Sequence, residues 1–171
     1  EYRGSPGGLI MSILGLDVGT STCKGIVISQ DGRILAQKRT EYSGQAVVRD
    51  DIAEISAEVF WNSTAELIRN LALAVENDPI EALAVSSHGE TLIPIGRNGE
   101  ALMPAMLSMD RRCQLQSERL MRRVGQEKIY ALTGSMMHPQ FPIPKIMWLK
   151  EVCPEVAAKV VHYDSASDYI H

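Results

Sequence analysis

The sequence predicts an α/β fold in which a mixed sheet opens with an antiparallel three-stranded meander and is surrounded by helices. Three observations carry this prediction. Two short apolar or β-branched runs, at residues 13–18 and 24–29, are joined by a tight polar segment. Apolar residues then recur at helical spacing within residues 56–79. A further short apolar run follows at residues 80–87. Such runs between turn signals are typical of strands, and a recurrence every three to four residues is typical of an amphipathic helix.

The opening meander is predicted from its connections. The strand at residues 24–29 runs into Asp31-Gly32, a dipeptide that strongly favours a hairpin turn. A third strand is therefore expected at residues 33–42. Both connections are too short to hold a helix, so the three strands are expected to pair antiparallel and not as a βαβ unit.

The first long helix is predicted to begin after Ser56, a good N-cap, with Glu58 in its first turn, where a carboxylate stabilises the helix dipole. It is expected to end near residues 77–79 (NDP). The remaining elements are expected, in chain order, as strands at 80–87 and 91–95, a turn at 98–99, helical segments from residue 112 onward, helices at 141–152 and 155–160, a brief strand at 160–163 and the start of a helix at 165–171.

Composition and charge exclude several classes of protein. The chain of 171 residues is 45% hydrophobic and 22% charged with a net charge of −4, which is typical of a soluble globular protein and gives no basic face for nucleic acid. No apolar run is long enough to span a membrane. Cys23, Cys113 and Cys153 form no CxxC or Cys/His cluster. They are expected to be reduced thiols of a cytoplasmic protein and not zinc ligands.

The domain organisation is predicted from the two ends of the chain. Residues 1–10 (EYRGSPGGLI) have the composition of a tag or linker, with Met11 as the natural start. Residues 11–171 are expected to form one domain or part of one. Because the last residue, His171, falls within a predicted helix, the chain is expected to be a fragment.

The segment that carries most chemical information is residues 17–24 (DVGTSTCK). A carboxylate ends a buried strand, a glycine and three hydroxyl residues form a tight turn, and a second strand leaves at once. Glycine lets phosphate oxygens approach backbone N–H groups, hydroxyls add donors, and a strand-end carboxylate suits Mg²⁺. Neither a GxxxxGK[ST] P-loop nor a GxGxxG Rossmann motif is present. An ordinary β-hairpin with polar turn residues fits the local pattern equally well.

A second polar group follows the strand at residues 80–87. Ligands gather at the carboxyl ends of strands in open sheets, and here His88, Gly89 and Glu90 come next. His88 can donate or accept a hydrogen bond, and Glu90 can accept from sugar hydroxyls. Taken by themselves, these residues are more often an unremarkable turn. Asp110, followed by two arginines, is a further substrate-binding candidate, although the N-cap of a helix is its favoured role.

Four motifs together resemble one family. Residues 14–29 (LGLDVGTSTCKGIVIS) resemble the phosphate-binding hairpin of the superfamily that includes actin, hexokinase and the FGGY carbohydrate kinases. Residues 86–112 (SSHGETLIPIGRNGEALMPAMLSMDRR) resemble the His-Gly turn, hairpin and Trp-x-Asp-x-Arg-like segment of xylulokinases and gluconokinases, with a Glu-Thr pair more like that of glycerol kinase. Residues 132–134 (LTG) and 141–149 (FPIPKIMWL) resemble the family's Thr-Gly and Pro-Lys…Trp-Leu stretches. Residues 11–171 are thus identified as the N-terminal part of an FGGY kinase.

The resemblance implies a ribonuclease H-like domain, the first of two that enclose ATP and a sugar, with the rest of the protein outside this chain. It implies ATP- and Mg²⁺-dependent phosphorylation of a sugar, polyol or sugar acid by in-line phosphoryl transfer. His88-Gly89 favours a xylulose- or gluconate-type substrate. Gly89 stands where glycerol kinases carry an arginine, and Ser108 stands where a tryptophan is expected. The general base, an Asp in this family, is expected beyond His171, so no catalytic residue is assigned and the fragment alone is expected to be inactive.

The resemblance also implies expectations about partners, alternatives and site residues. A homodimer is also expected, without nucleic-acid or membrane partners. The alternatives are a non-catalytic nucleotide-binding or regulatory protein of the same superfamily and a hexokinase-like or acetate kinase-like enzyme. ATP-phosphate binding is assigned to Asp17, Gly19, Thr20, Ser21, Thr22 and Lys24, with Asp17 also positioning the metal, and substrate binding to His88, Gly89, Glu90, Asp110 and Gln140.

Overall fold

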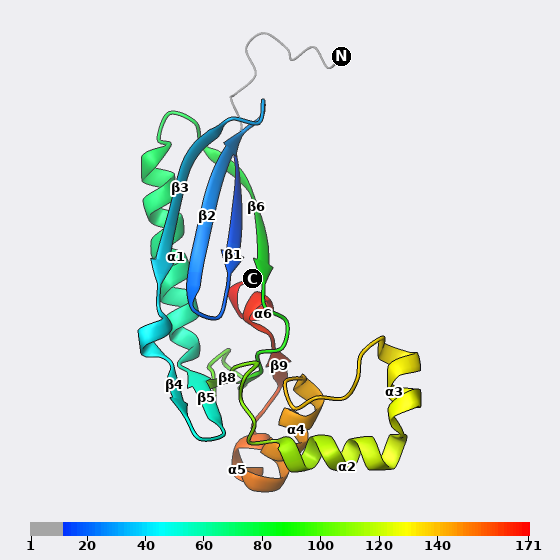
Figure 1. Cartoon of the computed structure of the whole chain (residues 1–171). Coiled ribbons are helices and arrows are strands. Elements are labelled where there is room, and N and C mark those ends of the chain that lie inside the picture. The colour runs from blue at the N-terminus through cyan, green and yellow to red at the C-terminus, as the bar shows by residue number, and fades with distance from the viewer. Residues whose placement is uncertain (1–11) are drawn as a thin grey trace.

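The computed structural model describes residues 12–171 (Figure 1). The expectation that residues 1–10 are a tag or linker lies outside the described residues. In the part of the chain that is described, no helix is both long enough and apolar enough to cross a lipid bilayer.

The central sheet confirms the predicted meander. Its strand order is β3-β2-β1-β6, in which the first three strands pair antiparallel and β6 lies parallel beside β1, so the sheet is mixed (Figure 1). β1 is therefore a central strand with a partner on each side. The strands are β1 (Ser12–Val18), β2 (Thr22–Ser29), β3 (Ile34–Glu41) and β6 (Ile80–Ser87).

One face of this sheet is covered by α1 (Ala57–Ala74). Ser56 occupies its N-cap position, as predicted, although the side chain makes no capping hydrogen bond. The helix packs closely on β2 at Gly25, where an added Cβ would collide with the side chain of Leu71. Glycine at this position therefore allows the helix and the sheet to approach each other.

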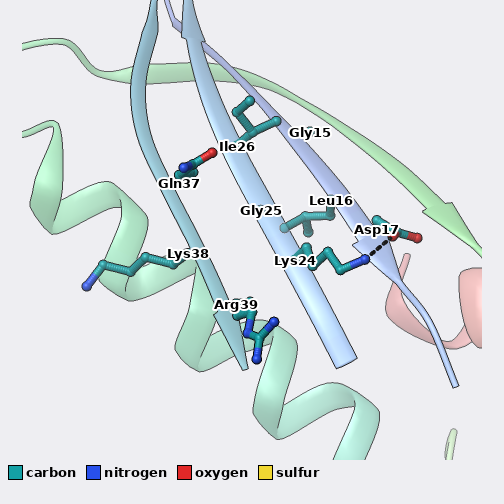
Figure 2. A pocket seen from close by; sticks show the side chains of 9 residues that line it. All are labelled: Gly15, Leu16, Asp17, Lys24, Gly25, Ile26, Gln37, Lys38 and Arg39. Carbon is teal, nitrogen blue, oxygen red and sulfur yellow. Dashed lines mark ion pairs between the residues drawn. The ribbon is translucent and has the colours of Figure 1, made fainter. Parts of the chain in front are cut away.

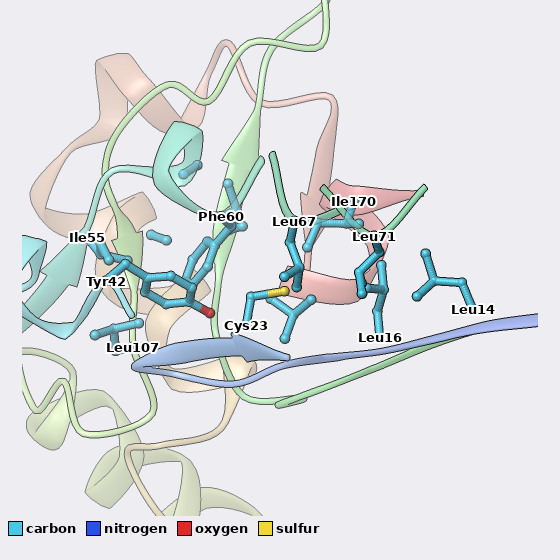
Figure 3. Packing of buried hydrophobic residues seen from close by; sticks show 14 of the residues in the cluster. Leu14, Leu16, Cys23, Tyr42, Ile55, Phe60, Leu67, Leu71, Leu107 and Ile170 are labelled. Carbon is cyan, nitrogen blue, oxygen red and sulfur yellow. The ribbon is translucent and has the colours of Figure 1, made fainter. Parts of the chain in front are cut away.

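The hydrophobic core lies between the sheet and α1 (Figure 3). Buried and more exposed residues alternate along β1 and β2, which places one set of side chains on the α1 side. α6 (Ala166–Ile170) contacts α1 and closes one end of this core. The labelled members of the buried cluster are Leu14, Leu16, Cys23, Tyr42, Ile55, Phe60, Leu67, Leu71, Leu107 and Ile170.

Two small sheets accompany the central one. The sequence does not predict the first, in which β4 (Val47–Arg49), β5 (Ile52–Ile55) and β8 (Ala105–Met106) are ordered β4-β5-β8. The strands expected near 91–95 and 160–163 are present as β7 (Ile93–Ile95) and β9 (His162–Asp164), which pair antiparallel with each other. A short 3-10 helix, η1 (Ser43–Gln45), follows β3. These strands are too short for an alternation of apolar and polar residues to be recognised in the sequence. They form because they pair with other strands, and two of these pairings, β5 with β8 and β7 with β9, join segments that are distant in sequence.

Helices dominate the chain after β8, as predicted. α2 (Gln114–Val124) and α3 (Gln126–Thr133) extend away from the central sheet (Figure 1). Gly125 and Gly134, which interrupt the helical pattern, have φ angles of 87° and 71°, in the region that glycine adopts most readily. The helix expected at 155–160 ends earlier, at Ala157. The helices are α2 (Gln114–Val124), α3 (Gln126–Thr133), α4 (Pro142–Val152), α5 (Pro154–Ala157) and α6.

Candidate functional site

The turn between β1 and β2 is tight, as the predicted phosphate site requires. The N–H of Gly19 donates to the carbonyl of Thr22 at 3.0 Å. A Cβ on Gly19 would lie 3.2 Å from that same carbonyl oxygen, so a glycine suits this position. Thr20 and Thr22 are half-buried and Ser21 is exposed. The turn therefore carries three hydroxyl residues at the carboxyl end of a central strand.

Tyr42, which the sequence interpretation placed only at the end of a strand, braces this turn. Its hydroxyl donates to the carbonyl oxygen of Gly19. Its backbone N–H and that of Ser43 donate to the carbonyl of Ser21, at 2.9 and 3.1 Å. Burial raises the pKa of Tyr42, so the phenol stays protonated and remains a donor. The turn is thus held by a buried side chain and by two backbone groups.

Asp17 is the second-last residue of β1 and lies on the face of the sheet that α1 does not cover (Figure 2). It is directly opposite Lys24 on β2, and the Lys24 Nζ lies 3.6 Å from its carboxylate. The Asp17 side chain is 55% exposed, so it is not sealed in packing. An ion pair this exposed contributes only about 0–1 kcal/mol to folding. The Asp17–Lys24 pair therefore contributes little to the stability of the fold. The exposed carboxylate of Asp17 is available to a ligand.

A hollow of about 760 Å³ extends from Asp17 along the uncovered face of β1, β2 and β3 (Figure 2). Its charged lining includes Lys24, Lys38 and Arg39. Lys24 pairs with Asp17 and Arg39 pairs with Glu41, so much of this positive charge is balanced by neighbouring carboxylates.

His88 connects the turn that follows β6 to the end of β1, beside the β1–β2 turn. β6 ends at Ser87, which pairs with Val18, the last residue of β1. The Nδ1 of His88 lies 3.0 Å from the carbonyl oxygen of Val18. Because a carbonyl can only accept, this contact places the ring proton on Nδ1. The ring packs against Phe60, with 5.7 Å between centroids.

The other ring nitrogen of His88 is an unused acceptor. Burial, as the main cause, lowers the pKa of His88, so the ring is neutral near pH 7 and Nε2 carries a lone pair. Nε2 is buried and has no hydrogen-bond partner among residues 12–171. A buried polar atom without a partner is unusual in a folded protein, and at a strand end it is a candidate ligand contact.

Gly89 and Glu90 continue this turn. Gly89 is exposed, and a Cβ there would meet nothing within 4 Å, so the site has open space beside its backbone. Glu90 is half-buried, and its backbone carbonyl accepts from the Nζ of Lys145 at 2.6 Å. The structure therefore brings His88, Gly89 and Glu90 together at the same sheet edge as the β1–β2 turn.

Asp110 is placed differently from the predictions. It is completely buried, and its carboxylate accepts from the N–H of Ala53 at 2.9 Å and from the Arg112 guanidinium at 2.8 Å. The favoured N-cap role is wrong, because α2 begins at Gln114 and Cys113 occupies the N-cap. A substrate contact for Asp110 stays a prediction, since the bonds of its carboxylate described here go to protein groups.

Arg112 links this buried carboxylate to α4. Its guanidinium also lies 2.9 Å from Glu54 and stands over the ring of Trp148, 5.0 Å from the centroid. Gln140 lies just before α4 and is half-buried, and its N–H donates to His138 Nδ1 at 3.2 Å. The substrate role of Gln140 stays a prediction.

Any metal ion bound by the described residues would have few protein ligands. Within residues 12–171, no group of three or more His, Cys, Asp or Glu side chains could hold a metal ion. Mg²⁺ usually takes only one or two carboxylates together with phosphates and water. The single exposed carboxylate of Asp17 beside the turn fits that pattern.

Comparison with known proteins decides the family. Residues 12–171 match the model described as the FGGY family of carbohydrate kinases, N-terminal domain. The chain belongs to the FGGY family of carbohydrate kinases. The resemblance predicted from the four motifs is confirmed.

Similar members of the FGGY family include a xylulose kinase from Staphylococcus xylosus, 24% identical over 158 residues, which cover 92% of this chain and 32% of that protein. The solved structure of gluconate kinase from Lactobacillus acidophilus has a TM-score of 0.86 and 27% identity, covering 94% of this chain and 32% of that one. Plasmodium falciparum glycerol kinase with ADP has a TM-score of 0.82 at 18% identity, covering 97% and 34%, and shows the fold alone. The chain spans about a third of the length of the curated relatives it matches.

Proposed function

We propose that this chain supplies the phosphate-binding turn and part of the sugar pocket of an ATP-dependent carbohydrate kinase. The observation that supports this most directly is the contact between His88 and Val18, which holds the two candidate turns side by side. Two of the three named proteins are kinases of xylulose and gluconate, and the third is a glycerol kinase, which shows the fold alone. The first two favour a xylulose- or gluconate-type substrate. As a domain assignment, residues 11–171 are part of the N-terminal domain of this enzyme. A cytoplasmic location and a homodimer belong to the same proposal.

On the nucleotide side, the turn would hold the phosphates of ATP. The backbone N–H groups and hydroxyls of Thr20, Ser21 and Thr22 would donate to phosphate oxygens, and Gly19 would let them approach. Lys24 would add a positive charge. Asp17 would hold Mg²⁺ together with the phosphates, and the ion would supply neutralisation of the charge that develops in phosphoryl transfer.

On the sugar side, this chain offers mainly acceptors. The Nε2 of His88 and the carboxylate of Glu90 both accept hydrogen bonds, and the hydroxyls of a sugar or sugar acid donate them. The open space beside Gly89 leaves room for a ligand at this point. None of the described carboxylates is assigned as general base, so this part of the proposal is binding and orientation and does not include proton transfer.

The nucleotide proposal is tested by titrating this chain with ADP and ATP, with and without Mg²⁺, and following its backbone amide resonances. We expect shifts at residues 18–22, and we expect Asp17→Asn to weaken the Mg²⁺-dependent affinity by about tenfold or more while stability changes by about 1 kcal/mol or less. Asp31→Asn, in the turn at the other end of β2, is the matched control. Unmoved turn resonances at saturating nucleotide would contradict the proposal.

The sugar proposal is tested in the same way with xylulose, gluconate and glycerol. We expect shifts at residues 88–90 with one of the first two. An assay of ADP release by this chain is expected to show no turnover, and robust release would show that a general base lies within it. Binding of ATP and sugar by the full-length protein without phosphoryl transfer would favour the regulatory alternative.

A further inference from the structure

Lys145 is a buried lysine whose ammonium group is bonded by backbone carbonyls. It lies on α4, and its side chain is completely buried. Its Nζ donates to three backbone carbonyls, those of Glu90 at 2.6 Å, Leu107 at 2.9 Å and Met106 at 3.2 Å. A lysine ammonium has three N–H donors, so each donor has an acceptor. A buried charge is costly without such partners, and these bonds account for its position.

The three carbonyls come from two segments that are distant in sequence. Glu90 belongs to the turn after β6, whereas Met106 and Leu107 lie at the end of β8. The two segments already meet through a pair of backbone hydrogen bonds between Leu92 and Met106, at 3.0 and 2.9 Å. Lys145 adds a link from α4 to the point where they meet. Its particular effect therefore falls on Glu90, which lies two residues before Leu92 and outside that pair.

The turn after β6 has few other supports. His88 is fixed on one side through Val18, at 3.0 Å. Gly89 is exposed and has nothing within 4 Å of where a Cβ would lie, so packing does not restrain it. On the other side, the carbonyl of Glu90 is held by Lys145. The path of the backbone between His88 and Glu90 is thus defined mainly by these two anchors.

We propose that Lys145 is a positioning residue that sets the conformation of the turn at residues 88–90, so that His88 Nε2 and the Glu90 carboxylate face the same ligand. This inference rests on the proposed function for its ligand, but the conformation of the turn can be measured without one. Lys145 itself does not touch the substrate in this proposal, because its three donors are all engaged by backbone carbonyls.

The test compares Lys145→Met with Lys145→Arg, which keeps the charge, and with Lys150→Met, an exposed lysine on the same helix. Circular dichroism and the methyl resonances of the core establish folding. We expect Lys145→Met to remain folded, to shift the amide resonances of residues 88–91, and to raise their hydrogen-exchange rates by about tenfold, the effect of losing one charged hydrogen bond. Lys150→Met should leave these amides unchanged.

A second readout reports whether the charge of Lys145 acts on His88. Burial is the main cause of the low pKa of His88, and the positive charge of Lys145 lowers it further. The NMR titration of His88 should therefore move to higher pH in Lys145→Met but not in Lys145→Arg. We also expect the dissociation constant for gluconate or xylulose to rise by about tenfold in Lys145→Met.

The outcomes separate this inference from the proposed function. If the wild-type chain binds neither sugar, the substrate proposal fails, and the exchange rates at residues 88–91 still decide the role of Lys145. A folded Lys145→Met with unchanged amides at residues 88–91 overturns the inference. If Lys145→Met does not fold, Lys145→Gln decides, because its amide keeps two donors but loses the charge and the third donor. Faster amide exchange at residues 88–91 in this variant supports positioning, and unchanged exchange there overturns it.

Discussion

The Nδ1 of His88 lies 3.0 Å from the carbonyl oxygen of Val18, so a side chain that follows β6 is tied to the last residue of β1. These residues are 70 positions apart in sequence. The parallel pairing of β1 with β6 brings their backbones together, and the histidine fixes how the second turn leaves the sheet. The nucleotide and sugar halves of the candidate site therefore share one short connection.

Protonation of His88 should destabilise the chain. Burial lowers the pKa of His88 below the ordinary 6.5, so between these two values the unfolded chain binds a proton that the native chain does not. This contribution to stability is present above about pH 6.5 and is lost as the pH falls through the native pKa. Urea unfolding between pH 8 and pH 5 should show the loss. His88→Asn keeps a donor for Val18 without titrating, and an unchanged pH dependence in this variant would contradict the assignment.

Removing the hydroxyl of Tyr42 should loosen the β1–β2 turn. Tyr42→Phe leaves the ring packed edge-on against Phe60 but removes the donor to the Gly19 carbonyl. We expect a loss of about 1 kcal/mol in the free energy of unfolding, as for one buried hydrogen bond. Nucleotide affinity should fall as well. Tyr130→Phe, on an exposed residue of α3, should change neither quantity, and equal effects of the two variants would exclude the bracing role.

The close approach of α1 to β2 should make Gly25 intolerant of a side chain. Gly25→Ala places a methyl group against Leu71, which is completely buried, and should cost about 1–3 kcal/mol through overpacking. Gly44→Ala, where the added methyl group meets nothing within 4 Å, is the control. The cost of Leu71→Ala should be smaller in the Gly25→Ala background than alone. Simple additivity in this double-mutant cycle would show that the two residues do not compete for space.

Lys145 should make stability rise with pH on the alkaline side. Burial lowers its pKa from 10.5 to about 8, against the opposing effects of nearby Cys113, Asp110 and Glu90 and with a smaller lowering from Arg112. Between about pH 8 and 10.5 the native chain has released a proton that the unfolded chain keeps, so this residue adds to the free energy of unfolding as the pH rises. Comparing wild type with Lys145→Met by urea unfolding at pH 7.5, 9 and 10 checks the sign. A slope that is the same in both proteins would contradict it.

The sequence predicts those parts of the site whose structure depends on residues close to one another in the sequence. Residues 17–24 fold into a hairpin turn through contacts within the same segment, and their composition alone indicates the turn. Tyr42 and Lys145 were not predicted as site residues, because their partners Gly19 and Glu90 lie 23 and 55 positions away and a lone tyrosine or lysine carries no local signal.

Asp110 shows the opposite error. Its local pattern, a carboxylate before a helical stretch, is typical of an N-cap. The residue instead bonds to Ala53, 57 positions earlier, within a small sheet whose strands the sequence does not reveal. Long-range pairing therefore overrides local preference here, as it does for β4, β5 and β8.

The place of β1 between β2 and β6 also has a kinetic consequence. Pairing β1 with β2 closes only the short turn at residues 19–21, whereas pairing β1 with β6 closes a loop of about sixty residues, which costs more chain entropy. A folding intermediate that contains only the hairpin would already have the glycine turn but would lack its histidine neighbour. The two candidate turns thus come to lie side by side only when β6, the strand of this sheet that comes last in the sequence, has docked.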